Sequence, residues 1–556
     1  VNDFIMESRS VLIHPDPEKP AKIRPIGIDD SIVRFVHRVE LNTRKAALQE
    51  HLEPIQMCGG TPGGCEIMGS VAQLNYNARL ATWVGDFKNG FNTPARSTVQ
   101  TRVANICAGL LPYLHRSYGR PTVLRSSTRE GRNKRVGLSA TGVRQGDPLS
   151  MIFFALTIHP TLVRINRIID DAKQEELARP NTTETELSLC ITRPGISAFA
   201  DDVNATTSNK LLSTLLPIIR RITRDELPGM SWCWPKCLIS GLTVTDDIKI
   251  PLIQAIELEI ANLEEHQLGG TEHASLETEL QGVQALPVVT TGCVTVGIPI
   301  GTQEFIKEQL DIKMQKYTRT LRHFKNSNLH AQTLMALLKK CISVRPYYLA
   351  RNIDPHYSNE AFTKWDKAVD DALAYKLLSN CPVDSTLSIL RSLPYHLGGC
   401  NIPRMVGPTA IIAYKKRNEM VNKFANKAEV QWEDLGWLTA VDQNEYPYLH
   451  TRQASCNTLT EREMINNPNN GYGTLTRILL DFNVNRLLIP ATLPGKWAPD
   501  DYDDDYDDEQ GLQRNDHVAQ LDIAYKTLFA SMLRAMIKPY LYQQGDPERI
   551  ALMDTS

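Results

Sequence analysis

The order of apolar and polar positions divides the chain into regions of two kinds. From about residue 20 to 300, short apolar runs alternate with helical stretches and with turns rich in Gly and Pro, which is typical of mixed α/β structure. Between 306 and 324, apolar residues recur every three or four positions and predict one face of an amphipathic helix. That face consists of Ile306, Leu310, Met314, Tyr317, Leu321 and Phe324. A helical pattern continues over about 330–430, and another amphipathic stretch covers about 517–541.

Two of the predicted strands end in aspartate. The apolar run Ala81–Val84 leads to Asp86, and a second apolar run ends in the pair Asp201 and Asp202. A single aspartate at a strand end is more often a turn or cap residue. Two such ends can converge on divalent metal ions, because Mg²⁺ takes carboxylate oxygens together with substrate phosphates. Since neighbouring side chains on a strand point to opposite faces, we expect Asp201 to face the metal and Asp202 to point partly outward.

The stretch GVRQGDPLSMIFFAL, residues 142–156, predicts a helix start. Asp147 suits the N-cap and Pro148 the first helical position, so we expect the helix to begin there. Gln145 and Gly146 come just before it. They allow two interpretations: a plain helix-start turn, or a loop in which Gly146 lets the backbone approach a nucleotide that Gln145 contacts.

Basic residues are concentrated between 114 and 144, where one acid, Glu130, stands among eight cations. These are Arg116, Arg120, Arg125, Arg129, Arg132, Lys134, Arg135 and Arg144. Such a density is typical of phosphate binding, whose strength falls steeply with salt. A solvated hairpin is the alternative interpretation. Lys313, Lys316 and Arg319 lie mostly off the apolar face of the 306–324 helix and suit contact with a nucleic-acid duplex, or a plain surface helix.

Composition narrows the class of protein. A length of 556 residues indicates several domains. No run of about 18 apolar residues occurs, so we expect no membrane partner. Eleven scattered cysteines without a CxxC pair argue against a zinc ribbon and favour a reducing, intracellular compartment. The net charge is −2, and eight of the carboxylates lie in one run at 500–509, so the rest of the chain carries +6. We interpret that run as a solvated loop.

Taken in order, several motifs resemble the reverse transcriptases of non-LTR (LINE-type) retrotransposons, from about residue 9 to 410. The most specific pairing is RQGDPLS at 144–150 followed by FADD at 199–202. The other matching motifs are KIRPIGI (22–28), QMCGGTPGGCE (56–66), DFKNGFN (86–92), GMSWCWPKC (229–237), VGIPIG (296–301) and LPYHLGGCNI (393–402). The chain begins with Val, and no endonuclease motif is recognisable, so we expect a piece of a longer protein or a partner domain outside this chain.

The resemblance implies an α+β right-hand polymerase fold. Fingers and a palm with a ferredoxin-like sheet would fill 1–300, a helical thumb 301–380, and a mostly helical C-terminal region 381–556. The implied activity is RNA-directed DNA synthesis, in which two Mg²⁺ ions, or Mn²⁺ in their place, assist nucleotidyl transfer. The implied partners are an RNA template, a DNA or RNA primer, dNTPs and a larger ribonucleoprotein. The family, rather than the residues, points to the nucleus.

The resemblance also assigns roles to residues. Asp86, Asp201 and Asp202 would be the catalytic carboxylates and metal ligands, with the backbone carbonyl of Phe87 as a further ligand. Phe91 would stand against the sugar of the nucleotide and exclude a 2′-hydroxyl. The other implied dNTP contacts are Lys22, Arg24, Gln145, Gly146 and Lys236. Lys22 and Arg24 could also be an exposed surface pair. Lys236 has two interpretations: the acid that protonates pyrophosphate, or a solvated lysine in a turn.

Two rival functions remain open. The first is an RNA-directed RNA polymerase or a polymerase with relaxed sugar choice, against which Phe91 argues. The second is a host-adopted nucleic-acid-binding or structural protein that keeps the fold and no longer synthesises. The intact set of three carboxylates argues against the second rival, and the near-neutral net charge favours it.

Overall fold

A computed structural model provides the fold. The structure describes residues 8–13, 24–127, 133–178, 195–265, 270–327, 329–377, 391 and 400–405. Described residues up to Gln309 form one compact unit and those from Leu310 form a second. The acidic run at 500–509, the stretch at 517–541 and almost all of the expected C-terminal region lie outside the described residues.

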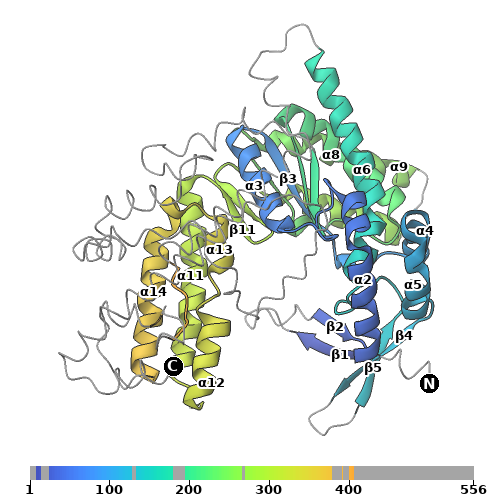
Figure 1. Ribbon diagram of the computed structural model, residues 1–556. Helices are drawn as coiled ribbons and strands as arrows, with labels where there is room; N and C mark the ends of the chain where they lie inside the picture. The colour runs from blue at the N-terminus through green and yellow to red at the C-terminus, as the bar shows by residue number, and fades with distance from the viewer. Residues whose placement is uncertain are drawn as a thin grey trace, which may run out of the picture. The chain divides into compact units, whose positions relative to one another are not determined.

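One sheet of the first unit has four strands in the order β2-β1-β4-β5. The strands are β1 (Ser8–Ile13), β2 (Arg24–Ile28), β4 (Thr122–Ser127) and β5 (Asn133–Ser139). Helices α2 (Ser31–Leu52) and α5 (Leu111–Tyr118) lie beside this sheet (Figure 1). The first turn of α2 is capped by the Asp30 side chain, which accepts a hydrogen bond from the backbone N–H of Ile32 at 2.9 Å.

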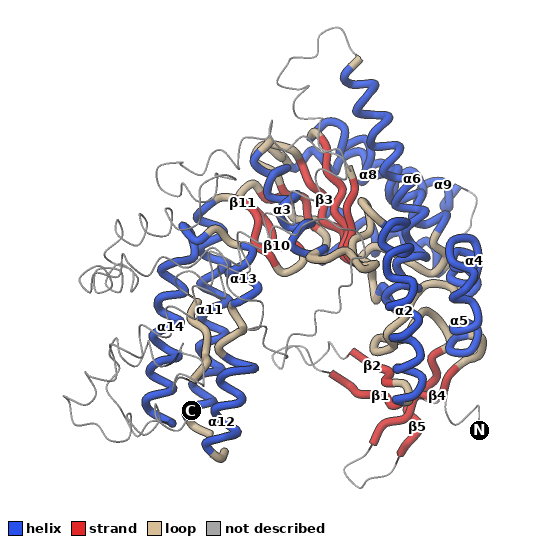
Figure 2. Tube along the Cα trace, in the orientation of Figure 1, coloured by secondary structure: helices blue, strands red, loops and turns tan. Residues whose placement is uncertain are grey.

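The second sheet has five strands in the order β6-β7-β3-β8-β9 (strands in red in Figure 2). They are β3 (Ala81–Asp86), β6 (Ile196–Phe199), β7 (Asp202–Thr207), β8 (Leu238–Ser240) and β9 (Val288–Val289). The β6–β7 hairpin pairs antiparallel with β3, and β3 pairs antiparallel with β8. With helices between β3 and β6 and between β7 and β8, this is the βαββαβ order of a ferredoxin-like sheet.

Helices α6 (Ser150–Leu177) and α8 (Asn209–Glu226) cover one face of the five-stranded sheet. Behind them, α4 (Arg96–Cys107) packs on α6, α9 (Ile250–Glu265) packs on α8, and α10 (Thr271–Gln284) packs on α9. Alternation along β3 points Ala81 and Trp83 to this side, where both are fully buried. Among the described helices, α6 alone is long and apolar enough to cross a membrane by length and composition. Its apolar window is 67% buried inside the protein, so α6 is a core helix.

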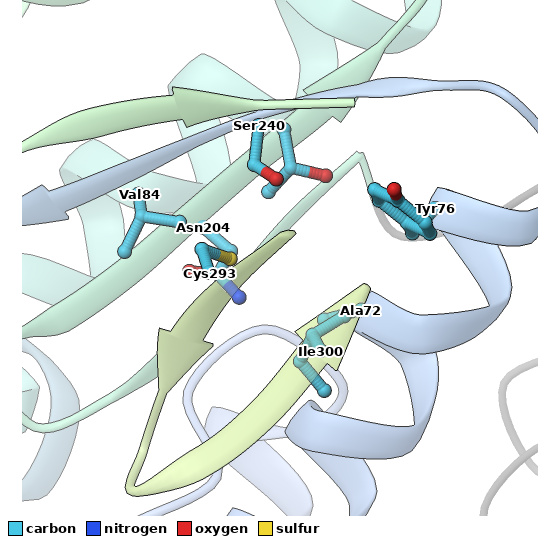
Figure 3. Close-up of a pocket in the computed structure, with 8 residues that line it drawn as sticks. Ala72, Tyr76, Val84, Asn204, Ser240, Cys293 and Ile300 are labelled. Atoms are coloured by element: carbon cyan, nitrogen blue, oxygen red, sulfur yellow. The ribbon is translucent and has the colours of Figure 1, made fainter. Parts of the chain in front are cut away.

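The opposite face of the sheet meets α3 (Gly64–Asn77) and the hairpin of β10 (Gly292–Thr295) and β11 (Ile298–Gly301). Figure 3 shows a cavity between them, lined by residues such as Tyr76 of α3, Asn204 of β7 and Cys293 of β10. Its volume of about 10 Å³ admits a single water and no nucleotide.

The second unit is helical where it is described. It contains most of α11 (Gln303–Lys325), then α12 (Ala331–Leu337), α13 (Tyr347–Asn352) and α14 (Pro355–Leu377). The predicted amphipathic face on α11 is confirmed: Leu310, Met314 and Leu321 are buried, and the Tyr317 ring meets Trp365 of α14 edge-on at 6.2 Å.

The α+β right-hand polymerase fold is confirmed: a strand-rich fingers region, a ferredoxin-like palm and a helical second unit. The expected helix start at Asp147 is wrong, because α6 begins at Ser150. The Asp147 carboxylate does accept a hydrogen bond from the Leu149 N–H at 2.9 Å, but the carboxylate is buried and bound to other side chains. Pro148 and Leu149 complete a turn before the helix begins.

Candidate polymerase active site

Two of the three candidate carboxylates lie side by side on the palm sheet. In the pairing of β3 with β7, Asp86 stands directly opposite Asp202. Residues directly opposite each other in an antiparallel pair project to the same face, with Cα atoms about 4.5–5.5 Å apart. Asp202 therefore projects to the same face of the sheet as Asp86, whereas we expected it to point partly outward. Asp201 belongs to the turn, so the strand alternation that we applied to the pair begins only at Asp202.

Asp201 occupies the turn between β6 and β7. The residue before it, Ala200, has φ of 54° and reverses the chain. Asp201 also meets the loop that follows Asp86, since a Cβ added to Gly90 would lie only 3.0 Å from the Asp201 Cβ. The structure thus brings Asp86, Asp201 and Asp202 to one corner of the sheet.

Gln56 supports this turn and was missed by sequence reasoning. Its buried amide donates to the Ala200 carbonyl at 3.2 Å and accepts from the Ala200 N–H at 2.9 Å. The flanking backbone adds two bonds, from Met57 N–H to the Ala198 carbonyl at 2.8 Å and from Ala198 N–H to the Ile55 carbonyl at 2.7 Å. The Gly-rich motif at 56–66 therefore begins with a segment that fixes the aspartate turn.

Phe87 presents its backbone toward this corner. Phe87 forms an antiparallel bridge with Trp232. The two hydrogen bonds of this bridge are made by the residues before and after Phe87. Cys233 N–H donates to the Asp86 carbonyl at 2.7 Å, and Lys88 N–H donates to the Ser231 carbonyl at 2.9 Å. Because successive carbonyls on a strand point to alternate sides, the Phe87 carbonyl faces away from Trp232, on the side of β7.

Lys236 pairs with Asp86. Its ammonium group forms an ion pair with the Asp86 carboxylate, at a lysine that is 46% exposed. Lys236 lies on a single turn of 3₁₀ helix, Trp234–Lys236, which the bridge at Phe87 holds against β3. Trp232 precedes this turn and is buried, and its ring stacks on Phe87 with centroids 4.0 Å apart.

The donor set can be compared with the needs of magnesium. Three carboxylates and a backbone carbonyl are the hard oxygen ligands that Mg²⁺ prefers. Within the described residues, the one group of three acidic, His or Cys side chains whose ligand atoms all lie within 4.8 Å is Asp29, His37 and Asp147, outside the palm. The palm carboxylates are more widely spaced, and Lys236 balances the charge of Asp86. Their oxygen donors are of the type that Mg²⁺ takes, but the three carboxylates do not form a closely spaced ligand group in this arrangement.

Phe91 follows the same loop. It lies on a 3₁₀ turn, Gly90–Asn92, and its half-buried ring stacks on Phe154 of α6 with centroids 4.7 Å apart and planes 16° apart. Its carbonyl accepts a hydrogen bond from the Val143 N–H at 2.7 Å. This bond connects Phe91 to the segment that carries Gln145 and Gly146, two and three residues further on.

Gly146 packs directly on β2. Its φ is +120°, and a Cβ would lie 2.6 Å from the Gly27 carbonyl oxygen, so only glycine fits. Gln145 is half-buried and Gly146 exposed. Arg24 is the first residue of the same strand β2, and Lys22 lies outside the described residues. The structure therefore brings the strand of Arg24, the Gln145–Gly146 turn and Phe91 together.

The candidate nucleic-acid residues of the fingers lie on or next to one hairpin. Arg120 is exposed just before β4, Arg125 is on β4, Lys134 and Arg135 are on β5, and Arg132 lies outside the described residues. Arg144 does not belong to this surface. It is 3% exposed and paired with Asp29 at 3.0 Å, which leaves it unable to contact phosphate.

The candidate residues of the thumb all lie on α11, in the second unit. Lys316 and Arg319 are exposed, as a duplex contact requires. Lys313 is half-buried, and burial lowers the pKa of its ammonium group.

No protein-family model and no curated protein matches this chain. Solved structures of telomerases show a distant similarity. The apo telomerase of Candida tropicalis is 11% identical, with a TM-score of 0.34, over 78% of this chain and 69% of that one. The telomerase of Candida albicans with a TWJ fragment of telomeric RNA is 9% identical, with a TM-score of 0.32, over 78% of this chain and 64% of that one. A truncated apo telomerase of Candida tropicalis is 12% identical, with a TM-score of 0.29, and this chain spans 50% of its length and matches over 42% of its own.

These scores are low. The strand order and register described above establish the fold without them.

Proposed function

We propose that this chain is an RNA-directed DNA polymerase of the non-LTR retrotransposon type. The observation that carries the proposal is the corner of the palm sheet where Asp86, Asp201 and Asp202 meet on neighbouring strands and their turn. Three carboxylates at one corner offer the oxygen ligands that a divalent cation takes from a protein. A cation-dependent reaction there would give all three a role.

The chain's own residues would divide the work of nucleotidyl transfer. A primer 3′-hydroxyl attacks the α-phosphate of a dNTP, and pyrophosphate leaves. Bound Mg²⁺ would neutralise phosphate charge and lower the pKa of the attacking hydroxyl. Asp86, Asp201, Asp202 and the Phe87 carbonyl would hold it. Lys236 carries a proton at the edge of this corner, where pyrophosphate would accept it.

Selection of the nucleotide would fall to Phe91 and the Gln145–Gly146 turn. Gly146 is exposed, so the backbone of the turn would be accessible to a ligand, and its lack of a side chain lets it rest on the Gly27 carbonyl. The Phe91 ring is held flat against Phe154 and cannot swing freely. A ring fixed in this way would exclude a 2′-hydroxyl and favour dNTPs over NTPs.

The partners that follow are an RNA template, a primer with a free 3′-hydroxyl, and a larger ribonucleoprotein. The basic hairpin β4–β5 and the exposed cations of α11 are the surfaces that would bind the nucleic acid. The nucleus is the compartment we propose, since a non-LTR element copies its RNA at chromosomal DNA.

A second candidate function is a silent nucleic-acid-binding protein with this fold. The ion pair of Lys236 with Asp86 favours it, because a lysine bound to a catalytic carboxylate competes with a metal ion. Nevertheless, the pair is solvent-exposed on the lysine side, and exposed ion pairs contribute only about 0–1 kcal/mol. A metal ion can overcome so weak a competitor.

The deciding experiment is primer extension with the purified chain, an RNA template and an annealed primer, in Mg²⁺ or Mn²⁺. Extension with dNTPs and little with NTPs supports the proposal. Equal extension with both supports a polymerase with relaxed sugar choice. Binding of the template–primer without extension in either metal supports the silent protein.

A further inference from the structure

A network of buried polar side chains surrounds the Gln145–Gly146 turn. On one side of the turn, the Arg144 guanidinium pairs with Asp29 at 3.0 Å and donates to the Ser117 carbonyl at 2.9 Å and the Thr122 hydroxyl at 3.0 Å. Its guanidinium also lies over the Tyr118 ring, 4.6 Å from the centroid. All of these residues are buried.

Asp147 anchors the other side of the turn. Its carboxylate is bound to His37 Nδ1 at 2.7 Å, to the Tyr118 hydroxyl at 2.5 Å and to the Leu149 N–H at 2.9 Å. Burial raises the pKa of this carboxyl, but the bonds from His37 and Tyr118 outweigh it and leave the pKa below its usual value. Asp147 is therefore an ionised carboxylate at neutral pH.

Asp29, His37 and Asp147 have the donor atoms and spacing of a metal site. However, the Arg144 guanidinium is already bonded to Asp29 and in contact with Tyr118, so the protein supplies its own cation there. Buried carboxylates need one such partner. The network is thus a structural device, and we do not assign a metal to it.

The two anchors leave only the residues between them for contact with a ligand. Arg144 and Asp147 are fixed from the fingers, and Gly146 rests on the Gly27 carbonyl of β2. A loop whose two ends are held by buried charges loses little conformational entropy when it binds a ligand, and it therefore binds that ligand more tightly. Tyr118 contacts both anchors: its ring lies under the Arg144 guanidinium, and its hydroxyl accepts from the Arg144 N–H and donates to Asp147.

We propose that His37 and Tyr118 are positioning residues that hold the Gln145–Gly146 turn in the shape that binds the incoming nucleotide. This inference rests on the proposed function, because it assigns the turn to the dNTP. His37 and Tyr118 touch no substrate and act through Asp147 and Arg144. Neither side chain is signalled as functional by the sequence, since His37 lies in the second turn of α2 and Tyr118 is the last residue of α5.

The test compares two variants that each lose one hydroxyl from α5. Tyr118→Phe removes the bond that the hydroxyl donates to Asp147 and the bond that it accepts from the Arg144 N–H at 3.3 Å, and Tyr113→Phe removes the bond that Tyr113 donates to Glu40 of α2. We expect Tyr118→Phe to raise the KM for dNTP by about 2- to 13-fold, the factor that corresponds to one hydrogen bond of ordinary strength, with kcat almost unchanged. Tyr113→Phe should leave the KM as in the wild type.

His37 provides the rescue experiment. His37→Leu removes the donor to Asp147 and should raise the KM for dNTP, and His37→Asn, whose amide can donate in place of Nδ1, should restore most of it. The thermal midpoint of each variant shows whether the fold is retained. A purely structural role predicts a lower midpoint in both Tyr118→Phe and His37→Leu with no change in KM, and that result overturns the inference.

Binding of dNTP, measured by its shift of the thermal midpoint in Mg²⁺, separates this inference from the proposed function. A wild-type chain that extends primers while Tyr118→Phe binds dNTP normally overturns the inference alone. A wild-type chain that binds dNTP but never extends overturns the function, and weaker binding by Tyr118→Phe then still supports the inference. A wild-type chain that does not bind dNTP overturns both.

Discussion

The stack of Phe91 on Phe154 leads to a prediction about sugar selection. Phe154 is fully buried in α6, and its ring supports the ring that we expect to exclude the 2′-hydroxyl. Substitution Phe154→Leu removes the parallel stack and leaves a space beside Phe91. The Phe91 ring can then tilt, so ribonucleotides should enter the site more readily.

The magnitude follows from the geometry of the stack. An aromatic pair at 4.7 Å with planes 16° apart is near the offset-stacked arrangement, which contributes about 0.5–1.5 kcal/mol beyond its buried area. If this energy holds Phe91 in its excluding position, its loss lowers the preference for dNTP over NTP by about 2- to 13-fold. The assay is single-nucleotide primer extension, with kcat/KM measured for one dNTP and its matching NTP.

Phe153→Leu is the matched control. Phe153 is the preceding residue of α6 and is equally buried, but its ring meets Tyr118 edge-on at 6.0 Å and not Phe91. Both variants should lose a similar amount of stability, about 1–3 kcal/mol. A fall in sugar preference that is equal in the two variants, or absent from Phe154→Leu, would refute the idea that the stack sets the position of Phe91.

Three further predictions concern charge. Lys236→Met should raise the apparent affinity for Mg²⁺ by about 1.4- to 5-fold, the factor that corresponds to the loss of one exposed ion pair. The affinity is measured from the thermal midpoint as Mg²⁺ is added, and Lys88→Met should leave it unchanged. Burial raises the pKa of Glu226, but bonds from Arg164 and Thr161 lower it below 4.5 overall. The stability lost in Glu226→Gln, measured by thermal unfolding, should therefore be largest at pH 7 and shrink as the pH falls below 4.5. A stability difference between wild type and variant that grows in acid would contradict this. Replacing Arg120 and Arg125 by Gln should reduce the slope of log binding constant against log salt by about 2 for a template–primer, and an unchanged slope shows that the hairpin does not contact phosphate.

The sequence predicted the features that depend on local order. The apolar run before Asp86 predicted strand β3, and the apolar run that ends at Asp201 and Asp202 predicted strand β6. The three- and four-residue spacing over 306–324 predicted α11 and its buried face. These features follow from periodicity and from turn chemistry, which act within a few residues.

Contacts between distant segments were beyond such reasoning. Gln56 lies 144 residues from Ala200, whose backbone it binds, and Lys236 lies 150 residues from Asp86. Arg144 was counted among surface cations because charge alone does not reveal burial, and its partner Asp29 is 115 residues away. Asp147 was assigned to a cap by its type, although its bond to Tyr118 comes from a helix that local pattern cannot place beside it.

The central claim is that the palm corner of Asp86, Asp201 and Asp202 catalyses DNA synthesis on RNA. The most direct measurement is primer extension by the wild type and by the double variant Asp201→Ala, Asp202→Ala. The matched control is Asp246→Ala, Asp247→Ala, an aspartate pair on another turn of the same unit. We expect the wild type and the control to extend the primer with dNTPs, and the palm variant to bind the template–primer without extending it. Extension by the palm variant at the wild-type rate would contradict the claim.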